Sequence, residues 1–169
     1  MGGVHEAVWY FEQVRPRLPG DEQAQLAAEE VLDHVGRLMG FETARLDDAA
    51  VSTWSSPSGL RMRVALVHTR EAVVGLSRAT RACDTLDHER ARPGTPDGLL
   101  CVVCGDDSRD ALEQALELRR MSRPVRLVGV NAVLALADSL EASALSHDLA
   151  AAALAPGASA DGLISALIG

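Results

Sequence analysis

The sequence contains no lysine, and its 16 basic residues are all arginine. Arginine stays protonated at physiological pH, so it cannot serve as a Schiff-base amine, as the lysine of a phosphate-binding P-loop or as a lysine general base. The sequence also lacks the GxGxxG, GxSxG and HExxH motifs that mark dinucleotide-binding proteins, serine hydrolases and zinc proteases. The absence of lysine excludes several enzyme mechanisms and indicates no particular one, and nucleophile triads cannot be assembled from spacing alone.

Cysteines and long apolar runs are also scarce. The chain has three cysteines, a small and odd number that argues against a disulfide framework and favours a reducing, cytoplasmic location. No apolar run approaches the roughly 18 residues of a membrane span. The N-terminus lacks the basic start and apolar segment of a secretory signal. With 169 residues, of which 47% are hydrophobic, the chain is expected to form one cytoplasmic globular domain without membrane contact.

The net charge of −8 is unevenly distributed along the chain. Nucleic-acid binding normally needs a basic face that displaces counterions from phosphate. Only the middle third of the sequence offers one, and its candidate phosphate contacts are Arg61, Arg63, Arg119, Arg120, Arg123 and Arg126. Because the whole chain is acidic, we expect these arginines to lie on a solvated surface, and nucleic acid is a disfavoured partner.

The order of expected elements is that of an α/β protein. Helices are expected at residues 4–18, 21–39, 70–87, 108–121, 131–140, 146–154 and 159–168, and strands at 41–46, 51–54, 60–68, 99–104 and 125–130. The alternation in the second half predicts parallel strands joined by right-handed crossovers. We therefore expect a three-layer fold with a mixed five-stranded sheet, in which an antiparallel meander precedes the parallel crossovers. The expected parts are an N-terminal amphipathic helix (1–19), an α/β core (20–142) and a C-terminal helical extension (143–169).

Three of the five aromatic residues are consecutive, at Trp9, Tyr10 and Phe11. Successive helical side chains point about 100° apart, so all three cannot face one core. Aromatic residues are enriched at protein interfaces. The triplet therefore predicts a surface for a protein partner or a second copy of the chain, unless this helix is buried on two sides.

Cys101 and Cys104 have the CxxC spacing of redox and metal sites. They lie in an expected strand, however, where positions i and i+3 point to opposite faces. We therefore expect buried structural cysteines. A helix and a loop separate His68, Cys83 and His88, which lack metal-ligand spacing, so no metal site is expected.

The layout resembles the restriction-endonuclease-like fold of the PD-(D/E)xK type, and in particular the Mrr-related branch. The resemblance covers about residues 22–142. It is carried by the helix ending at Gly40, the three-strand meander, the apolar strand LLCVVC and the segment PVRLVGVNAVLALA. In that family, an Asp on the second strand and a Glu and a Lys two apart on the third bind Mg²⁺ and activate water.

This resemblance implies a degenerate site. It places Ser52, Thr53 or Trp54 near the Asp position, Leu66 at the Glu position and His68 at the Lys position. Strand alternation puts Leu60, Met62, Val64, Leu66 and His68 on one face, which is apolar except for the histidine. A shift of one residue gives Ala65 and Val67 instead. We expect no catalytic residues, metal or cofactor, and a protein-interaction or scaffold role, with a homodimer through the first helix as its simplest form.

Two alternatives remain open. One is an active Mg²⁺-dependent nuclease with migrated carboxylates, which would use Glu30, Glu42 or Asp48, with His68 as a base in place of lysine. Asp48 and its neighbour Asp47 belong to the turn before the second strand. The other alternative is a receiver-like or flavodoxin-like regulatory domain, prompted by the sequence Gly-Asp-Asp at residues 105–107. A fully parallel sheet would favour the regulatory domain, and an antiparallel meander would exclude it.

Overall fold

The computed structural model describes residues 2–45, 50–105 except 90–97, residue 113 and residues 123–156. The elements are α1 (Val4–Val14), η1 (Arg15–Arg17), α2 (Glu22–Leu38), β1 (Glu42–Arg45), β2 (Ser52–Ser55), β3 (Arg61–His68), η2 (Thr69–Glu71), α3 (Ala72–Glu89), β4 (Leu99–Cys104), β5 (Val125–Gly129), α5 (Val130–Glu141) and α6 (His147–Leu154). The helix expected at 159–168, and all of that at 108–121 except residue 113, lie outside the described residues.

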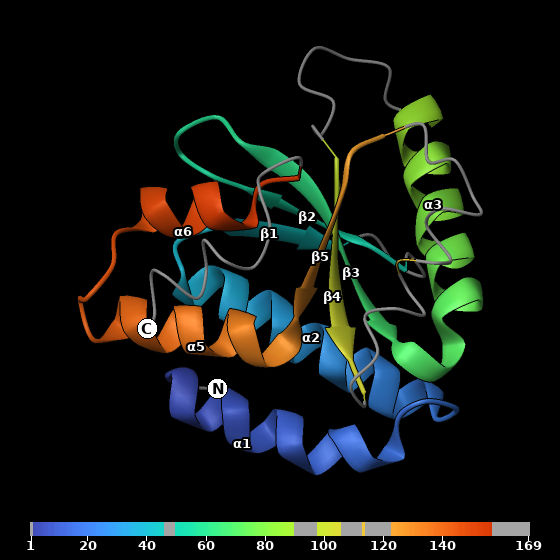
Figure 1. The fold of residues 1–169 in the computed structure, drawn as a ribbon, viewed down its shortest axis with the longest axis horizontal. Helices are drawn as coiled ribbons and strands as arrows, with labels where there is room; N and C mark the ends of the chain where they lie inside the picture. The colour runs from blue at the N-terminus through green and yellow to red at the C-terminus, as the bar shows by residue number, and fades with distance from the viewer. Residues whose placement is uncertain (1, 46–49, 90–97, 106–112, 114–122, 157–169) are drawn as a thin grey trace.

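The strands form one sheet in the order β1-β2-β3-β4-β5 (Figure 1). β1 and β2 pair antiparallel, as do β2 and β3, whereas β3 and β4 pair parallel, as do β4 and β5. The predicted meander followed by parallel crossovers is confirmed. Because a receiver or flavodoxin sheet is parallel through these strands, the antiparallel meander excludes that alternative.

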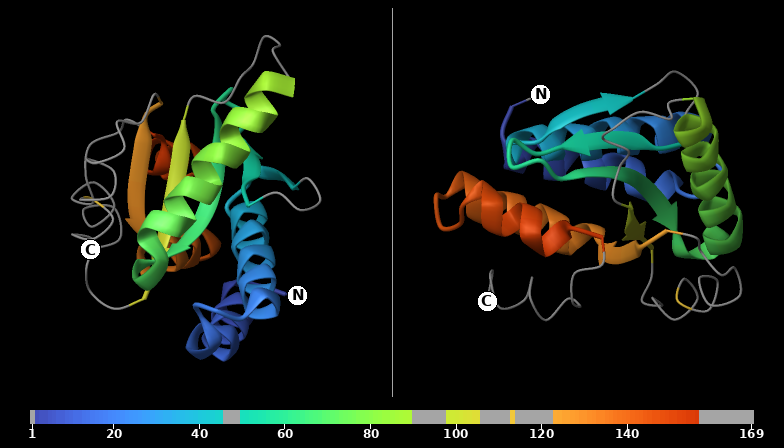
Figure 2. Two further views of the ribbon diagram at one scale, coloured as in Figure 1. Left: turned by 90° about the vertical axis from the view of Figure 1, so that its right-hand side faces the viewer. Right: turned by 90° about the horizontal axis from the view of Figure 1, so that it is seen from above.

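Helices cover both faces of the sheet and make three layers (Figure 2). On one face, α1, α2, α5 and α6 contribute to the larger hydrophobic cluster. On the other face, α3 covers a smaller cluster. Alternation along β3 divides its side chains between the two: Val64 and Leu66 join the larger cluster, and Ala65 and Val67 join the smaller one.

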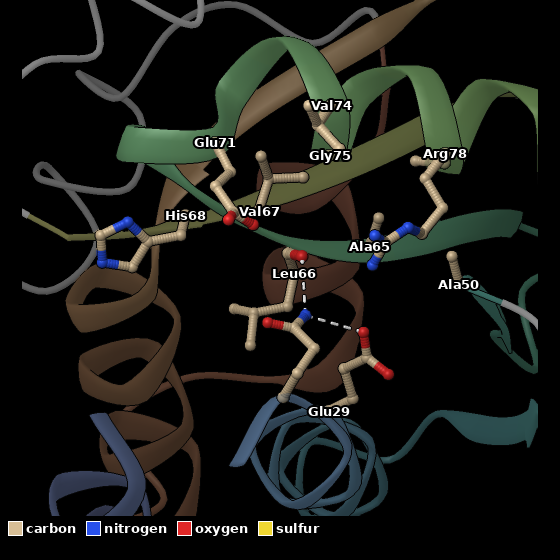
Figure 3. A pocket seen from close by; sticks show the side chains of 12 residues that line it. Glu29, Ala50, Ala65, Leu66, Val67, His68, Glu71, Val74, Gly75 and Arg78 are labelled. Carbon is tan, nitrogen blue, oxygen red and sulfur yellow. Dashed lines mark hydrogen bonds between the residues drawn. The ribbon is translucent and has the colours of Figure 1, made fainter. Parts of the chain in front are cut away.

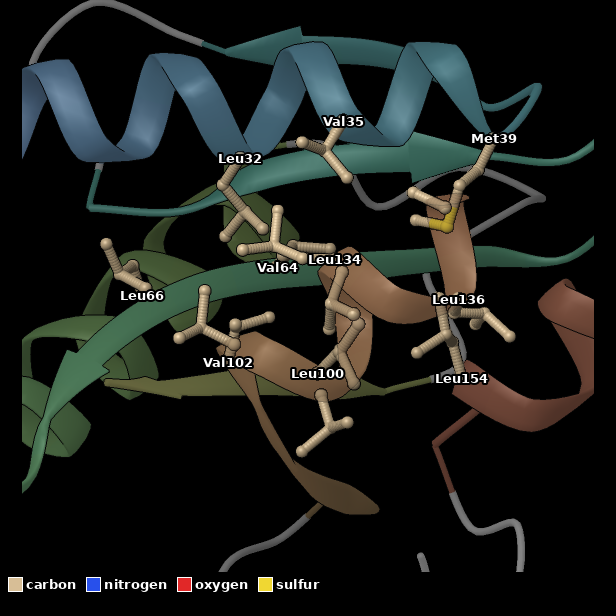
Figure 4. Close-up of a cluster of buried hydrophobic side chains, with 14 of the residues drawn as sticks. Leu32, Val35, Met39, Val64, Leu66, Leu100, Val102, Leu134, Leu136 and Leu154 are labelled. Atoms are coloured by element: carbon tan, nitrogen blue, oxygen red, sulfur yellow. The ribbon is translucent and has the colours of Figure 1, made fainter. Parts of the chain in front are cut away.

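The larger cluster joins both ends of the described chain to the sheet. Val4, Ala7 and Phe11 of α1 belong to it together with Leu136 of α5 and Leu154 of α6. Figure 4 shows side chains of α2, β3, β4, α5 and α6 meeting in this layer. The N-terminal helix and α6 therefore share one core with the sheet. Among the described residues, no helix has the length and apolarity to cross a membrane.

The cysteines are buried as expected. Cys101 lies in the smaller cluster beside Cys83, and Cys104 lies in the larger cluster on the opposite face of β4. All three are free thiols. Burial raises the pKa of Cys101 to about 12 and that of Cys104 to about 11. Because a reactive cysteine needs its thiolate form, this burial favours a structural role for Cys101 and Cys104.

The ends of α2 are marked by local signals that direct the chain into the meander. The carboxylate of Asp21 accepts a hydrogen bond from the backbone N–H of Ala24 and caps the first turn. Gly40 follows the last turn with φ +96°, a conformation that favours glycine. The helix is thereby held above the sheet, with one side facing β1 and β2.

Candidate functional site beyond the end of strand β2

A pocket lies where β3 extends past β2. The strand register pairs Ser55 with Arg61 and Ser52 with Val64, so the last four residues of β3 continue beyond β2. There they lie between α2 and α3 (Figure 3). The pocket is lined by Gln25, Glu29, Ala50, Ala65, Leu66, Val67, His68, Glu71, Val74, Gly75, Arg78 and Ala79. Its volume of about 30 Å³ leaves room for one or two water molecules.

The pocket side of α2 is polar because Gln25 and Glu29 are one helical turn apart on it. The Gln25 amide donates to Glu29 Oε1 over 2.8 Å and to the backbone carbonyl of Leu66 over 3.3 Å. It therefore satisfies a carbonyl at the uncovered edge of β3. Figure 3 shows Glu29 reaching up from α2, with Glu71 and Arg78 on the α3 side of the strand.

Glu29 is a buried carboxylate, with only 6% of its surface exposed. Burial raises its pKa, while the hydrogen bond from Gln25 and the charge of Arg45 act in the opposite direction. An Arg45 guanidinium nitrogen lies 2.8 Å from Glu29 Oε2. The next residue, the fallback carboxylate Glu30, is exposed.

Asp33, one turn after Glu29, forms a second buried carboxylate site under α2. Its Oδ1 accepts hydrogen bonds from Ser52 Oγ over 2.6 Å and from Trp54 Nε1 over 3.0 Å. Its Oδ2 lies 2.9 Å from a guanidinium nitrogen of Arg45. Two residues that the resemblance placed near the metal-binding Asp, Ser52 and Trp54, therefore connect the sheet to α2.

Thr53, the third residue at that position, lies between Ser52 and Trp54 and points to the opposite face. Its hydroxyl accepts a hydrogen bond from Arg63, its partner in the strand register. Since this pair lies five residues before His68, the structure does not bring Thr53 to the end of β3. The pocket lining includes Ala50 and none of Ser52, Thr53 and Trp54.

At the expected Glu position, Leu66 is buried, with 5% exposure, among the apolar side chains beneath α2. At the expected Lys position, His68 is half-buried and lines the pocket. Its Nδ1 accepts a hydrogen bond from the backbone N–H of Arg70 over 3.1 Å and so caps η2. The end of β3 therefore presents an imidazole and no carboxylate.

The remaining fallback carboxylates do not gather at the pocket. Glu42 is exposed at the start of β1, and Asp47 and Asp48 lie outside the described residues. Glu71, which the sequence analysis did not consider, lines the pocket from η2. Within the part of the chain that the structure describes, no group of three or more His, Cys, Asp or Glu is arranged to hold a metal ion.

The candidate phosphate contacts that the structure describes do not form a basic surface. Arg63 and Arg126 are buried in their strands, which contradicts the expectation of a solvated face for them. Arg61 is half-buried, and the largely buried Arg123 forms an ion pair with the exposed Asp84. Arg119 and Arg120 lie outside the described residues. Among the arginines that are described, these four do not form an exposed phosphate-binding strip.

The aromatic triplet of α1 is divided by the helix geometry. Trp9 is 58% exposed and Tyr10 is 41% exposed, and their rings meet edge to face at a centroid distance of 5.0 Å. Phe11 is buried in the larger hydrophobic cluster and is therefore not part of a contact surface, contrary to its assignment from sequence. We refer to Trp9 and Tyr10 as the aromatic pair.

Comparison with known proteins identifies the fold. No family model and no curated protein sequence matches the chain. Among solved structures, the restriction endonuclease FokI matches with a TM-score of 0.56 and 11% sequence identity. The match covers 84% of this chain but only 28% of that enzyme. At this identity the likeness concerns the fold alone, which is restriction-endonuclease-like.

Proposed function

We propose that this chain is a nuclease-like domain that does not cleave nucleic acid and acts as a protein-interaction module. The observation that carries the proposal is the burial of Leu66 among apolar side chains at the strand position where the resemblance expects a metal-binding carboxylate. A buried leucine offers no oxygen to Mg²⁺, which prefers carboxylate, phosphate and water oxygens.

The charges around the pocket support this proposal. Glu29 is already held by Arg45 and Gln25, and burial favours its neutral form. Glu71 is exposed on the far side of β3. A hard dication would have to displace Arg45 from Glu29, or bind to Glu71 with few other oxygen ligands nearby. We therefore expect neither a resident metal nor another cofactor.

The partner that we propose is a second copy of the chain, bound through α1. The aromatic pair is the largest exposed aromatic surface among the described residues, and its two rings already contact each other. Rings that are rigid and half-exposed lose little conformational entropy when they are covered. An isologous dimer places the same surface of each copy against the other, so one helix supplies both halves of the interface.

A cleavage assay tests the loss of activity. Plasmid and single-stranded DNA are incubated with the full chain and Mg²⁺ or Mn²⁺, beside Glu29→Gln and His68→Ala variants. We expect no cleavage by any of the three proteins. Cleavage by the original chain that disappears in either variant would overturn the proposal, because contaminating nuclease would be unaffected by the substitutions.

The alternative is a nuclease with a rearranged site, and the pocket itself favours it. Glu29, Glu71 and His68 line one small cavity at the end of β3. Such a site would use His68 as the base and two carboxylates from helical segments rather than from the strands. The cleavage assay distinguishes this alternative directly, since both substituted residues belong to it.

A further inference from the structure

A serine and a histidine from distant parts of the chain meet outside the pocket. Ser56 follows β2, and His147 begins α6, 91 residues later. Ser56 Oγ lies 2.6 Å from His147 Nε2. The other ring nitrogen, Nδ1, lies 2.6 Å from the backbone carbonyl oxygen of Met39 at the end of α2. The imidazole therefore bridges a hydroxyl and a carbonyl.

The carbonyl determines which ring nitrogen carries the proton. A carbonyl oxygen only accepts hydrogen bonds, so Nδ1 must donate to Met39. In the neutral imidazole, Nε2 is then the acceptor, and the Ser56 hydroxyl donates to it. A hydroxyl aimed at a base that a third group orients is the arrangement that activates serine nucleophiles.

The surroundings hold the imidazole in this orientation. The ring of Phe41 meets it edge to face at a centroid distance of 4.8 Å. A Cβ atom at Gly40 would come within 2.9 Å of Nδ1, so the glycine leaves the space that the ring occupies. A half-buried histidine with contacts on several sides is pre-positioned as a base rather than free to rotate.

The serine lies at the base of an exposed turn. Ser56 itself is buried, and the next three residues, 57–59, are exposed. The backbone N–H of Ser58 lies 3.3 Å from Ser56 Oγ. This hydrogen bond holds Ser56 Oγ in place within its own turn.

We infer that Ser56 is a nucleophile activated by His147 and that it accepts acyl or phosphonyl groups from small activated esters. In the acyl case, Ser56 Oγ bonds to the ester carbonyl carbon as its proton passes to His147 Nε2. The bond to the leaving oxygen then breaks, and that oxygen takes the proton from His147. Water, with His147 as base, hydrolyses the acyl-serine by the same steps. This site uses no residue of the proposed nuclease-like pocket.

A fluorophosphonate probe tests the assignment on the full chain. Ser56 Oγ would displace fluoride from phosphorus, and its proton would move to His147. We expect one label per chain, located on Ser56 by peptide mass spectrometry. The neighbouring serine provides the control: Ser55→Ala should be labelled at the original rate, and Ser56→Ala should lose the label.

His147→Asn separates activation from a structural role. The asparagine amide nitrogen lies near the position of Nδ1 and can still donate to Met39, but it provides no acceptor in place of Nε2. We expect a fold that is intact by circular dichroism and labelling slowed by about 100-fold or more, since a general base typically contributes about 10²–10⁴-fold. Equal rates in His147→Asn and the original chain would overturn the inference, as would a label on another residue or labelling no faster than in Ser56→Ala.

Discussion

The indole nitrogen of Trp54 donates a hydrogen bond to Asp33 Oδ1 over 3.0 Å and joins the middle strand of the meander to α2. Trp54 is fully buried and also packs against Phe41 at a ring distance of 5.4 Å. Gly36 lets the helix approach, since a Cβ there would lie 2.8 Å from the indole. Strand β2, where the sequence resemblance expects a metal-binding Asp, is thereby held to α2 by buried side chains.

Removing the carboxylate of Asp33 should destabilise the fold strongly. Asp33→Ala leaves the Ser52 hydroxyl, the Trp54 N–H and the Arg45 guanidinium without this acceptor in a buried site. Breaking a buried charged network by removing one partner costs about 3–5 kcal/mol. Urea denaturation measures the loss. Asp84→Ala is the matched control, because its ion pair with Arg123 is exposed on the aspartate side and is worth about 1 kcal/mol or less. Similar losses of unfolding free energy in both variants would contradict a stabilising role for the hydrogen bonds and ion pair of Asp33.

The stability of the chain should depend on pH through Glu29. Its pKa is raised above 4.5 in the folded protein, so the folded state binds more protons than the unfolded state between 4.5 and the folded value. Stability contributed by the neutral carboxyl is therefore present below this window and declines as the pH rises through it. Glu29→Gln lacks this titration.

The measurement is the difference in unfolding free energy between the original chain and Glu29→Gln, taken from urea curves between pH 4 and pH 8. The original chain should lose stability relative to the variant as the pH increases. A relative gain would show that attraction to Arg45 outweighs the burial of Glu29, and that the carboxylate is charged and available.

Self-association should depend on the aromatic pair. Trp9→Asp places a charge where the proposed dimer buries an indole, so light scattering after size exclusion should show a monomer in place of a dimer. Val73→Asp serves as the control, because Val73 is similarly exposed, at 54%, but lies on α3. A mass that is the same in Trp9→Asp and in the original chain would rule out a dimer through this helix.

The sequence predicted the sheet well because its signals are local. The alternation in β3 and the apolar run in β4 follow from side-chain period, and the turn chemistry at residues 55–59 marks the hairpin between β2 and β3. Cys101 and Cys104 fell on opposite faces for the same reason. The alternation of side chains along a strand is enough to predict which face each residue occupies.

The burial of polar residues on α2 was not predicted, because helical periodicity does not show which side of a helix is covered by other elements. Gln25, Glu29 and Asp33 are spaced by four residues along α2, so the sequence places them in one row but does not show that the row faces the sheet. Ser56 and His147 had no signal of this kind. They are distant in sequence, and only the docking of α6 against the end of α2 brings them together.

The order of the strands in the sheet has a consequence for synthesis of the chain. Each strand pairs with the one before it, so every strand emerging from a ribosome finds its neighbour already made. The larger cluster is different, because α1 packs against helices made much later: the backbone N–H of Val4 donates to Glu141 Oε1 of α5 over 3.2 Å. A nascent chain can thus pair its strands in order, whereas its larger cluster is complete only after α5 and α6 have been made.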